Sequence, residues 1–327
     1  MDNGNLVISL DFELYWGVRD KKSLSQYGEN IKGVHKVIPR LLGYFNNYKI
    51  SATFSTVGLL FFETKEELMK NIPHPIPEYS NSNFSPYISG FDLVGKNHTE
   101  DIYHFAPTLI EEIKKRPEQE IGSHTFSHYY CLESGQTLET FTADMKMAIE
   151  IASKKGIKIT SLVFPRNQYN DSYLKACSDL GIICYRGNEF SWLYEPKNGA
   201  QESKVRRGLR LVDAYFNLSG HNCYNKKTLQ NKYPINIPAS RFLRPYNSTL
   251  KIIDYLKLRR IKTGMTHAAK NNLIYHLWWH PHNFGIDQDK NFSFLEKILE
   301  HYKILNVRYN FKSITMSKLA QQILDEK

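Results

Sequence analysis

The sequence predicts an α/β protein built on a parallel sheet or barrel. Short apolar runs alternate with amphipathic segments along most of the chain, and the first three elements form a strand–helix–strand unit. The 327 residues suffice for one large α/β barrel or two ordinary domains. Because no repeat or linker divides the chain, we expect one domain over residues 1–327.

The opening unit is the clearest part of the pattern. Residues 6–10 form an apolar run that ends at Asp11 and predicts a buried strand. Residues 34–48 have apolar positions at helical spacing, and residues 51–57 predict the second strand. Residues 72–97 are rich in Pro, Ser and Asn, which is typical of a functional lid or a binding loop.

The alternation continues through the rest of the chain, with one irregular stretch. Residues 192–246 have weak periodicity and are interpreted as an elaborated crossover within the same domain. The other predicted strands are 120–123, 160–164, 182–185 and 272–279, and the other predicted helices are 108–116, 138–155, 171–180, 247–260, 292–302 and 313–324.

Composition limits the class of partner. The hydrophobic fraction of 41% argues against disorder, and the net charge of +10 suits anionic partners such as nucleotide-linked substrates, lipid headgroups or nucleic acid. The basic runs at 204–210 and 257–262 lack the regular aromatic interleaving of a strand-binding platform, so nucleic-acid binding is not expected. Four cysteines without CxxC spacing predict free thiols.

Targeting signals are not apparent in the sequence. The first residues lack the basic and apolar regions of a signal peptide, and no run approaches the ~18 apolar residues of a membrane span. We therefore expect a cytoplasmic protein without a membrane span. The oligomeric state is not predicted.

Two histidines four residues apart follow the predicted strand at 120–123. In a helical turn, residues at i and i+4 lie on one side, so His124 and His128 could bind one cation. Gly122 would allow a tight exit from the strand. A catalytic zinc-type centre needs a third protein ligand and an open position.

Other predicted strands also end in polar residues. Asp11 and Glu13 lie two apart and share a face in extended chain, so one could bind a cation and the other act as a general base. Arg166 could orient a carboxylate or an anionic intermediate. His280 could protonate a leaving amine, whereas His282, like His276, is expected only to pack against aromatic rings.

The segment Ser123-His124-Thr125-Phe126-Ser127-His128 resembles the metal-binding motif of NodB-type polysaccharide deacetylases, carbohydrate esterase family 4. Residues 9–13 resemble the family's first motif in a variant with one inserted residue, and residues 164–168 are similar to its third motif. His280 resembles the histidine acid of the fifth motif. A fourth motif is not evident, although residues 185–189 stand near its place.

This resemblance implies a distorted (β/α)7 barrel that removes an N-acetyl group from a sugar of a polysaccharide or its precursor. Because no export signal is evident, we expect a cytoplasmic precursor and a role in surface polysaccharide biosynthesis. The substrate could be nucleotide- or lipid-linked. Zinc is the expected metal, with cobalt or nickel as alternatives. The implied roles are a base (Asp11), an acid (His280), a supporting arginine (Arg166), metal ligands (Glu13, His124, His128) and sugar contacts (Asn167, Trp279, Trp16).

Two other functions remain open. An allantoinase-like amidohydrolase would use the same fold to open an amide ring, with or without metal. A non-catalytic glycan-binding module would keep the groove without turnover. The sequence also leaves open whether Asp11 or Glu13 binds the metal.

Overall fold

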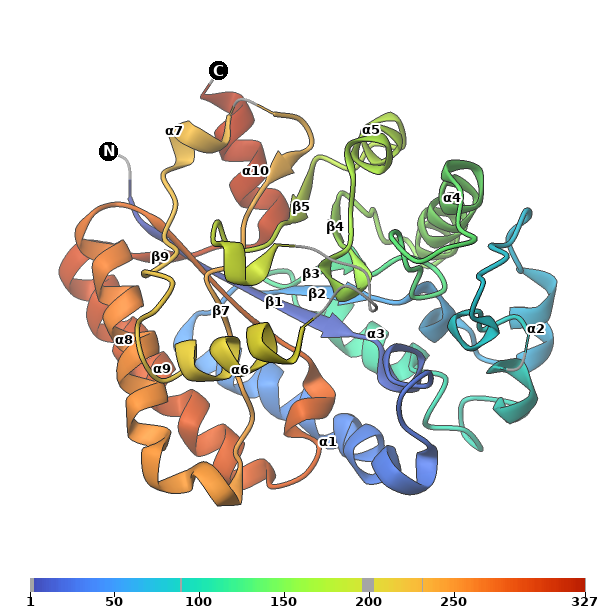
Figure 1. The fold of residues 1–327 in the computed structure, drawn as a ribbon, viewed down its shortest axis with the longest axis horizontal. Coiled ribbons are helices and arrows are strands. Elements are labelled where there is room, and N and C mark those ends of the chain that lie inside the picture. The colour runs from blue at the N-terminus through green and yellow to red at the C-terminus, as the bar shows by residue number, and fades with distance from the viewer. Residues whose placement is uncertain (1–2, 89, 196–202, 231, 327) are drawn as a thin grey trace.

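The strands of the computed structural model form one parallel sheet (Figure 1). The structure describes residues 3–88, 90–195, 203–230 and 232–326. The order across the sheet is β6-β5-β4-β3-β2-β1-β8-β7, and β9 pairs with β1. The strands are β1 (Asn5–Phe12), β2 (Thr53–Thr56), β3 (Glu120–Ser123), β4 (Ser161–Val163), β5 (Cys184–Arg186), β6 (Ile235–Asn236), β7 (Arg241–Phe242), β8 (Ile274–Trp279) and β9 (Lys312–Ser313).

Helices surround this sheet (Figure 1). They follow the strands as the sequence predicts, because each has an apolar face that packs against the core. The helices are α1 (Leu24–Tyr48), α2 (Lys65–Lys70), α3 (Pro107–Lys114), α4 (Leu138–Lys154), α5 (Asp171–Asp179), α6 (Lys204–Asp213), α7 (Lys226–Leu229), α8 (Asp254–Lys270), α9 (Gln288–Tyr309) and α10 (Met316–Asp325). None of those in the described residues is long and apolar enough to cross a bilayer.

The sheet is curled because its two outer strands are consecutive in sequence. Only residues 237–240 separate β6 from β7, so the ends of the sheet lie within about 18 Å of each other at the reach of extended chain. The linking residues form hydrogen bonds with β5 and with β8, because Ile237 N donates to Tyr185 O and Ser240 N donates to His276 O. The result is an incomplete barrel with a seam between β6 and β7.

Strand β1 shows how the sequence divides its side chains between two faces. Leu6, Leu10 and Phe12 alternate into the main hydrophobic core. Val7 has the opposite parity and packs with β4, β5 and the terminal helix α10. Asp11 has the same parity as Val7, so it lies inside the barrel at the carboxyl end of the strand.

The terminal helix α10 closes the amino-terminal end of the barrel. Met316, Leu319 and Ile323 are fully buried against the interior residues of the sheet. Glu120, at the start of β3, accepts hydrogen bonds from Thr53 Oγ1 (2.7 Å) and from the backbone N of Ser317 (3.1 Å). The barrel interior is therefore filled at this end, which leaves the carboxyl ends of the strands for a site.

Two differences from the predicted elements have local causes. Helix α1 begins at Leu24 rather than at residue 34, because Ser23 and Gln26 form a capping box ahead of a polar first turn. Residues 192–246 contain α6, α7, β6 and β7 rather than one irregular crossover. Three of them, α7, β6 and β7, have only four, two and two residues, which is too short to produce a clear period.

Candidate active site

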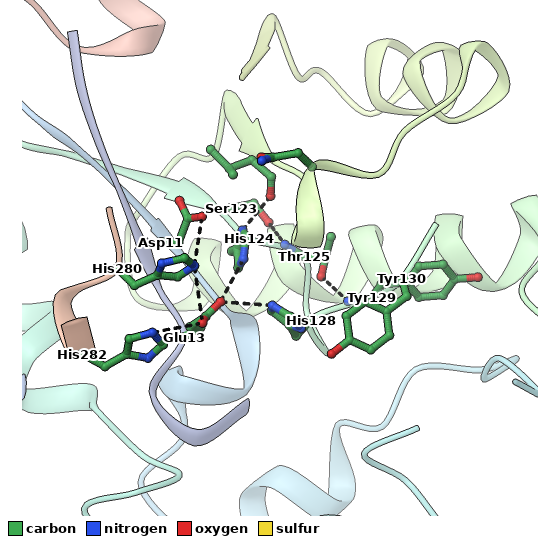
Figure 2. Close-up of polar contacts among 12 residues, drawn as sticks. Asp11, Glu13, Ser123, His124, Thr125, His128, Tyr129, Tyr130, His280 and His282 are labelled. Carbon is green, nitrogen blue, oxygen red and sulfur yellow. Dashed lines mark hydrogen bonds and ion pairs between the residues drawn. The ribbon is translucent and has the colours of Figure 1, made fainter. Parts of the chain in front are cut away.

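Six titratable side chains meet at the carboxyl ends of β1, β3 and β8 (Figure 2). Parallel strands bring residues far apart in sequence to one edge of a barrel. A cavity of about 410 Å³ opens onto them. Its lining includes Asp11, Glu13, Lys21, His124, His128, Arg166, Asn167, Phe242, Trp278, His280 and His282.

Glu13 lies at the centre of this group. Its Oε2 atom is 3.2 Å from Nε2 of His124 and 3.0 Å from Nε2 of His128 (Figure 2). All three side chains are buried. Burial opposes ionisation of Glu13, but the imidazoles of His280, His124 and His128 hold its pKa well below the usual range.

This donor set fits a divalent cation. Nδ1 of His124 is 2.8 Å from the carbonyl oxygen of Val163, so Nδ1 carries the proton and donates it. Nε2 is then the atom of His124 that faces Glu13 Oε2. Burial lowers the pKa of His128 to about 4, so its ring is neutral. Two imidazole nitrogens and a carboxylate oxygen that face one another form a donor set that suits a divalent cation between them.

The two histidines do not lie on a helical turn, contrary to the sequence prediction. They belong to a loop in which Thr125 (φ 62°) and His128 (φ 60°) have left-handed backbone conformations. Asp144 on α4 holds the loop, since its carboxyl accepts from Phe126 N at 2.7 Å and Ser127 N at 3.1 Å. The four-residue spacing therefore brings the rings together through a fixed loop.

Glycine is required at position 122 because β3 lies close to its neighbour β4, and not because the chain turns there. A side chain on Gly122 would overlap Ser161 of the neighbouring strand β4. Gly17 has a similar role on the first loop, because a methyl group there would overlap the carboxyl of Glu13. Gly17 thus allows backbone to close over the central carboxylate.

Asp11 is paired with Arg186 rather than with Arg166. Arg186 Nη1 donates to Asp11 Oδ1 at 2.7 Å, and Nη2 donates to Oδ2 at 2.8 Å, with both side chains buried. Burial opposes ionisation of Asp11, but this guanidinium lowers its pKa overall. Arg186 also lies 4.0 Å from the ring centroid of Trp278 and donates to Asn167 Oδ1 at 3.0 Å. Arg186 thus takes the position that the sequence analysis gave to Arg166.

Arg166 lines the cavity but is held by other carboxylates. It forms ion pairs with Asp20 and with Glu133, the latter at 3.2 Å, and its guanidinium lies 4.0 Å above the ring of Tyr130. Its backbone is left-handed (φ 54°), as is that of Asn167 (φ 52°), so the chain turns sharply after β4. This turn directs Arg166 away from Asp11.

The β8 end contributes two histidines. Nε2 of His280 is 3.6 Å from Asp11 Oδ2 and 3.7 Å from Glu13 Oε1. Nε2 of His282 is 3.8 Å from the same Glu13 oxygen, and the two rings stack with centroids 4.9 Å apart. Glu13, His280 and His282 thus form a second group with metal-ligand spacing. Burial lowers the pKa of His282 to about 3, and His280 remains partly exposed at the cavity.

The predicted sugar contacts of Trp16 and Trp279 are corrected by the structure. Both side chains are fully buried; Trp16 donates to His104 O at 2.8 Å, and Trp279 packs on Phe284. Trp278 lines the cavity instead. Successive residues of a strand point to opposite faces, so only one of the two tryptophans can face the site. Asn167 does line the cavity, as predicted.

Sequence reasoning missed Arg186, His282 and Asp144. Arg186 ends β5 and could have been found by treating that strand end like the others. His282 returns to the site because residues 281–284 form a short 3-10 helix after β8. Asp144 gave no signal, because its position on α4 has the spacing of an ordinary helical residue.

The structure is thus an incomplete parallel α/β barrel with histidines and carboxylates at the carboxyl ends of its strands. Residues 30–185 match the family model described as polysaccharide deacetylase. The relationship to NodB-type polysaccharide deacetylases that the histidine motif indicates is therefore confirmed. The matched range begins after Glu13, so the interpretation of residues 9–13 as a variant first motif stays a prediction.

Solved structures support the same fold. A Mycobacterium smegmatis protein provisionally described as a polysaccharide deacetylase is 12% identical, with a TM-score of 0.61 over 99% of this chain and 92% of that one. A Pseudomonas aeruginosa PAO1 protein described as a probable polysaccharide deacetylase is 9% identical, with a TM-score of 0.56 over 98% of this chain and 90% of that one. Puue allantoinase is 10% identical, with a TM-score of 0.55 over 97% of this chain and 88% of that one. A comparison with curated protein sequences finds no significant match. At these identities the structures establish the (β/α)7 fold alone.

Proposed function

We propose that this protein is a metal-dependent hydrolase that removes an N-acetyl group from a sugar of a polysaccharide or its precursor, in surface polysaccharide biosynthesis. The carrying observation is the convergence of the two imidazoles of His124 and His128 on one oxygen of Glu13, at 3.2 and 3.0 Å. Glu13, His124 and His128 would hold the cation. Two imidazoles and a carboxylate favour zinc, with cobalt and nickel as alternatives.

The cation, when bound, would polarise the amide carbonyl and lower the pKa of water. Asp11 would take the proton of the attacking water, since Arg186 keeps the carboxylate ionised and fixes its orientation through two hydrogen bonds. The same bonds lower the basicity of Asp11. Asp11 would therefore act as a base only toward a water molecule whose pKa the cation has lowered.

His280 would return a proton to the departing amine. Its Nδ1 is 3.3 Å from Asn283 Oδ1, which can accept only from a protonated nitrogen. For His280 to act as an acid, the transferred proton would leave from Nε2, the nitrogen that faces Asp11 and Glu13. Its partial exposure places it where a leaving group can reach it. Protonation of the amine prevents its return to the acetyl carbon.

The decisive experiment measures acetate release from N-acetylated sugars and oligosaccharides by the zinc-loaded protein. Asp11→Asn and His280→Ala should each lower kcat by about 100-fold or more, as removal of a general acid or base does. Asp289→Asn and His267→Ala are the matched controls, because both residues are away from the cavity. Unchanged acetate release in both site variants would reject these assignments.

An allantoinase-like activity is the second candidate, favoured by the structural likeness to Puue allantoinase. It predicts ring opening of a cyclic amide in place of acetate release. Turnover of allantoin without release of acetate from any N-acetyl sugar would establish it. A glycan-binding module, the third candidate, predicts sugar binding with no turnover of either substrate.

A further inference from the structure

A second chamber adjoins the candidate active site and has a different character. It has a volume of about 270 Å³ and shares Arg166, Asn167, Phe242 and Trp278 with the lining of the first cavity. The two cavities are thus parts of one groove, with aromatic rings at their junction. The rest of the second chamber is lined by Asn188, Glu189, Tyr194, Glu195, Arg210 and Arg244.

Arg244 is the notable cation of this chamber. It is half-buried, and no carboxylate in the described residues forms an ion pair with it. Burial lowers its pKa, and the neighbouring positive charges of Arg210 and Arg241 add to this effect. A guanidinium remains charged in such surroundings, and a half-buried charge without a carboxylate partner among the described residues is suited to bind an external anion.

The backbone around Arg244 is fixed, while its side chain keeps free donors. Leu243 N donates to Trp278 O at 2.8 Å, and Lys257 Nζ donates to Arg244 O at 3.2 Å. The guanidinium itself makes one long bond among the described residues, from Nη2 to Arg210 O at 3.4 Å. A fork of N–H donors on a fixed support is the geometry that binds phosphate through two parallel bonds.

The carboxyl groups of the chamber do not cancel this positive charge. Glu189 is buried, and burial raises its pKa to about 7, so it is partly protonated near neutral pH and can donate a hydrogen bond. Glu195 also lines the chamber but is exposed, so solvent screens its charge. Arg166, although paired with Asp20 and Glu133, adds a further guanidinium at the junction.

We infer that the second chamber binds a phosphate group that the sugar substrate carries, with Arg244 as the main contact. The inference rests on the proposed function: the acetamido group would lie near Glu13, the sugar ring at Phe242 and Trp278, and the phosphate at Arg244. The substrate class is then an N-acetyl sugar joined to phosphate. Such a phosphate could belong to a nucleotide-linked or a lipid-linked precursor.

The binding test uses the full chain treated with EDTA, so that anions cannot bind a metal. Isothermal titration with inorganic pyrophosphate should show binding to the wild type, and Arg244→Gln should weaken it by about 10-fold or more, as loss of charge-assisted hydrogen bonds does. Arg244→Lys should retain part of the affinity. Arg259→Gln on α8 removes an exposed arginine and should leave it unchanged. Thermal midpoints verify that each variant is folded.

A kinetic test then identifies the source of the phosphate. With zinc bound, a nucleoside diphosphate N-acetyl sugar and a polyprenyl diphosphate N-acetyl sugar are compared with the methyl glycoside of the same sugar. One diphosphate substrate should have the lower KM, and Arg244→Gln should abolish this advantage while turnover of the methyl glycoside persists.

Three outcomes would contradict the inference. The first is equal pyrophosphate affinity in Arg244→Gln and wild type. The second is tighter binding of glucuronate, a sugar carboxylate titrated in the same way, than of pyrophosphate. The third is no KM advantage of either diphosphate sugar over the methyl glycoside. In each case acetate release from the methyl glycoside would leave the proposed function intact. Conversely, Arg244-dependent pyrophosphate binding without any acetate release would reject the proposed function alone.

Discussion

Replacing Asp144 by Asn should change how stability depends on pH between about 4 and 7. The Asp144 carboxyl is buried beneath the histidine loop and accepts from Phe126 N, Ser127 N and Ser127 Oγ. Burial raises its pKa from 3.8 to about 7, more than these three bonds lower it. The folded protein therefore binds this proton more tightly than the unfolded chain. The resulting stability is full below about pH 4 and is lost as pH rises through about 7.

The size of the effect follows from the shift. One pKa unit corresponds to about 1.36 kcal/mol, so the wild type loses on the order of 4 kcal/mol across this range, whereas the Asn variant does not. The Asn amide nitrogen cannot accept from Ser127 N, which costs roughly 1–3 kcal/mol at any pH. Between pH 5 and pH 8 the free energy of unfolding of the variant, relative to the wild type, should therefore rise by about 3 kcal/mol. At pH 8 the variant should be equally stable or more stable.

The assay is urea unfolding of both proteins at pH 5, 6, 7 and 8, monitored by circular dichroism and compared at equal m values. Subtracting the two free energies of unfolding removes groups common to both proteins. Asp289→Asn is the control, because the Asp289 side chain is 92% exposed and its pairing should matter little at any pH. A deficit of the Asp144 variant that grows from pH 5 to pH 8 would refute the argument, since it would mean that the three donors keep the carboxylate ionised.

Three further predictions concern the centre of the site. Gly17→Ala should weaken zinc binding by about 10-fold or more, because the added methyl group displaces the Glu13 carboxyl. The affinity is measured by titration against a chelating dye. Gly43→Ala is the control, because open space surrounds Gly43 in α1 and the zinc affinity should not change. Arg186→Gln should lower the free energy of unfolding by about 3–5 kcal/mol in urea, since it leaves the buried charge of Asp11 without its partner; a loss below 1 kcal/mol would contradict this. Removal of zinc by EDTA should lower the thermal midpoint, and added zinc should restore it, because a ligand at 100 times its Kd stabilises the fold by about 2.7 kcal/mol; a midpoint indifferent to zinc would argue against the metal site.

The alternation of strands and helices was predictable because burial imposes strong periods on both. Residues 120–123 were expected as a strand and form β3, and Asp11, His124 and His280 do meet at one edge as strand-end residues of a parallel sheet should. Glu13 joined them because it lies two residues beyond Asp11. These inferences need only the direction of each strand and the parity of its side chains.

The remaining features depend on information that the sequence pattern does not carry. Trp278 and Trp279 are chemically identical in the sequence, and only the register of β8 against β1 decides which one faces the cavity. Arg186 ends β5 and Arg166 follows β4, but a left-handed turn at Arg166 directs that side chain to Asp20. Such turns are set by tertiary contacts rather than by local residue preference.

The seam between β6 and β7 has a consequence for how this barrel could diversify. Between β5 and β6 the described residues contain the helices α6 and α7, and Tyr224 forms a bridge with Ile274 of β8. The parts of this connection outside that bridge can therefore change in length while β1–β5 and β8 keep their register. Doubling a flexible loop costs only about 0.6 kcal/mol in closure entropy. The chain after the seam then carries Phe242 and Arg244 into the groove. Substrate preference could therefore evolve in this one stretch while the histidine–carboxylate end stays as it is.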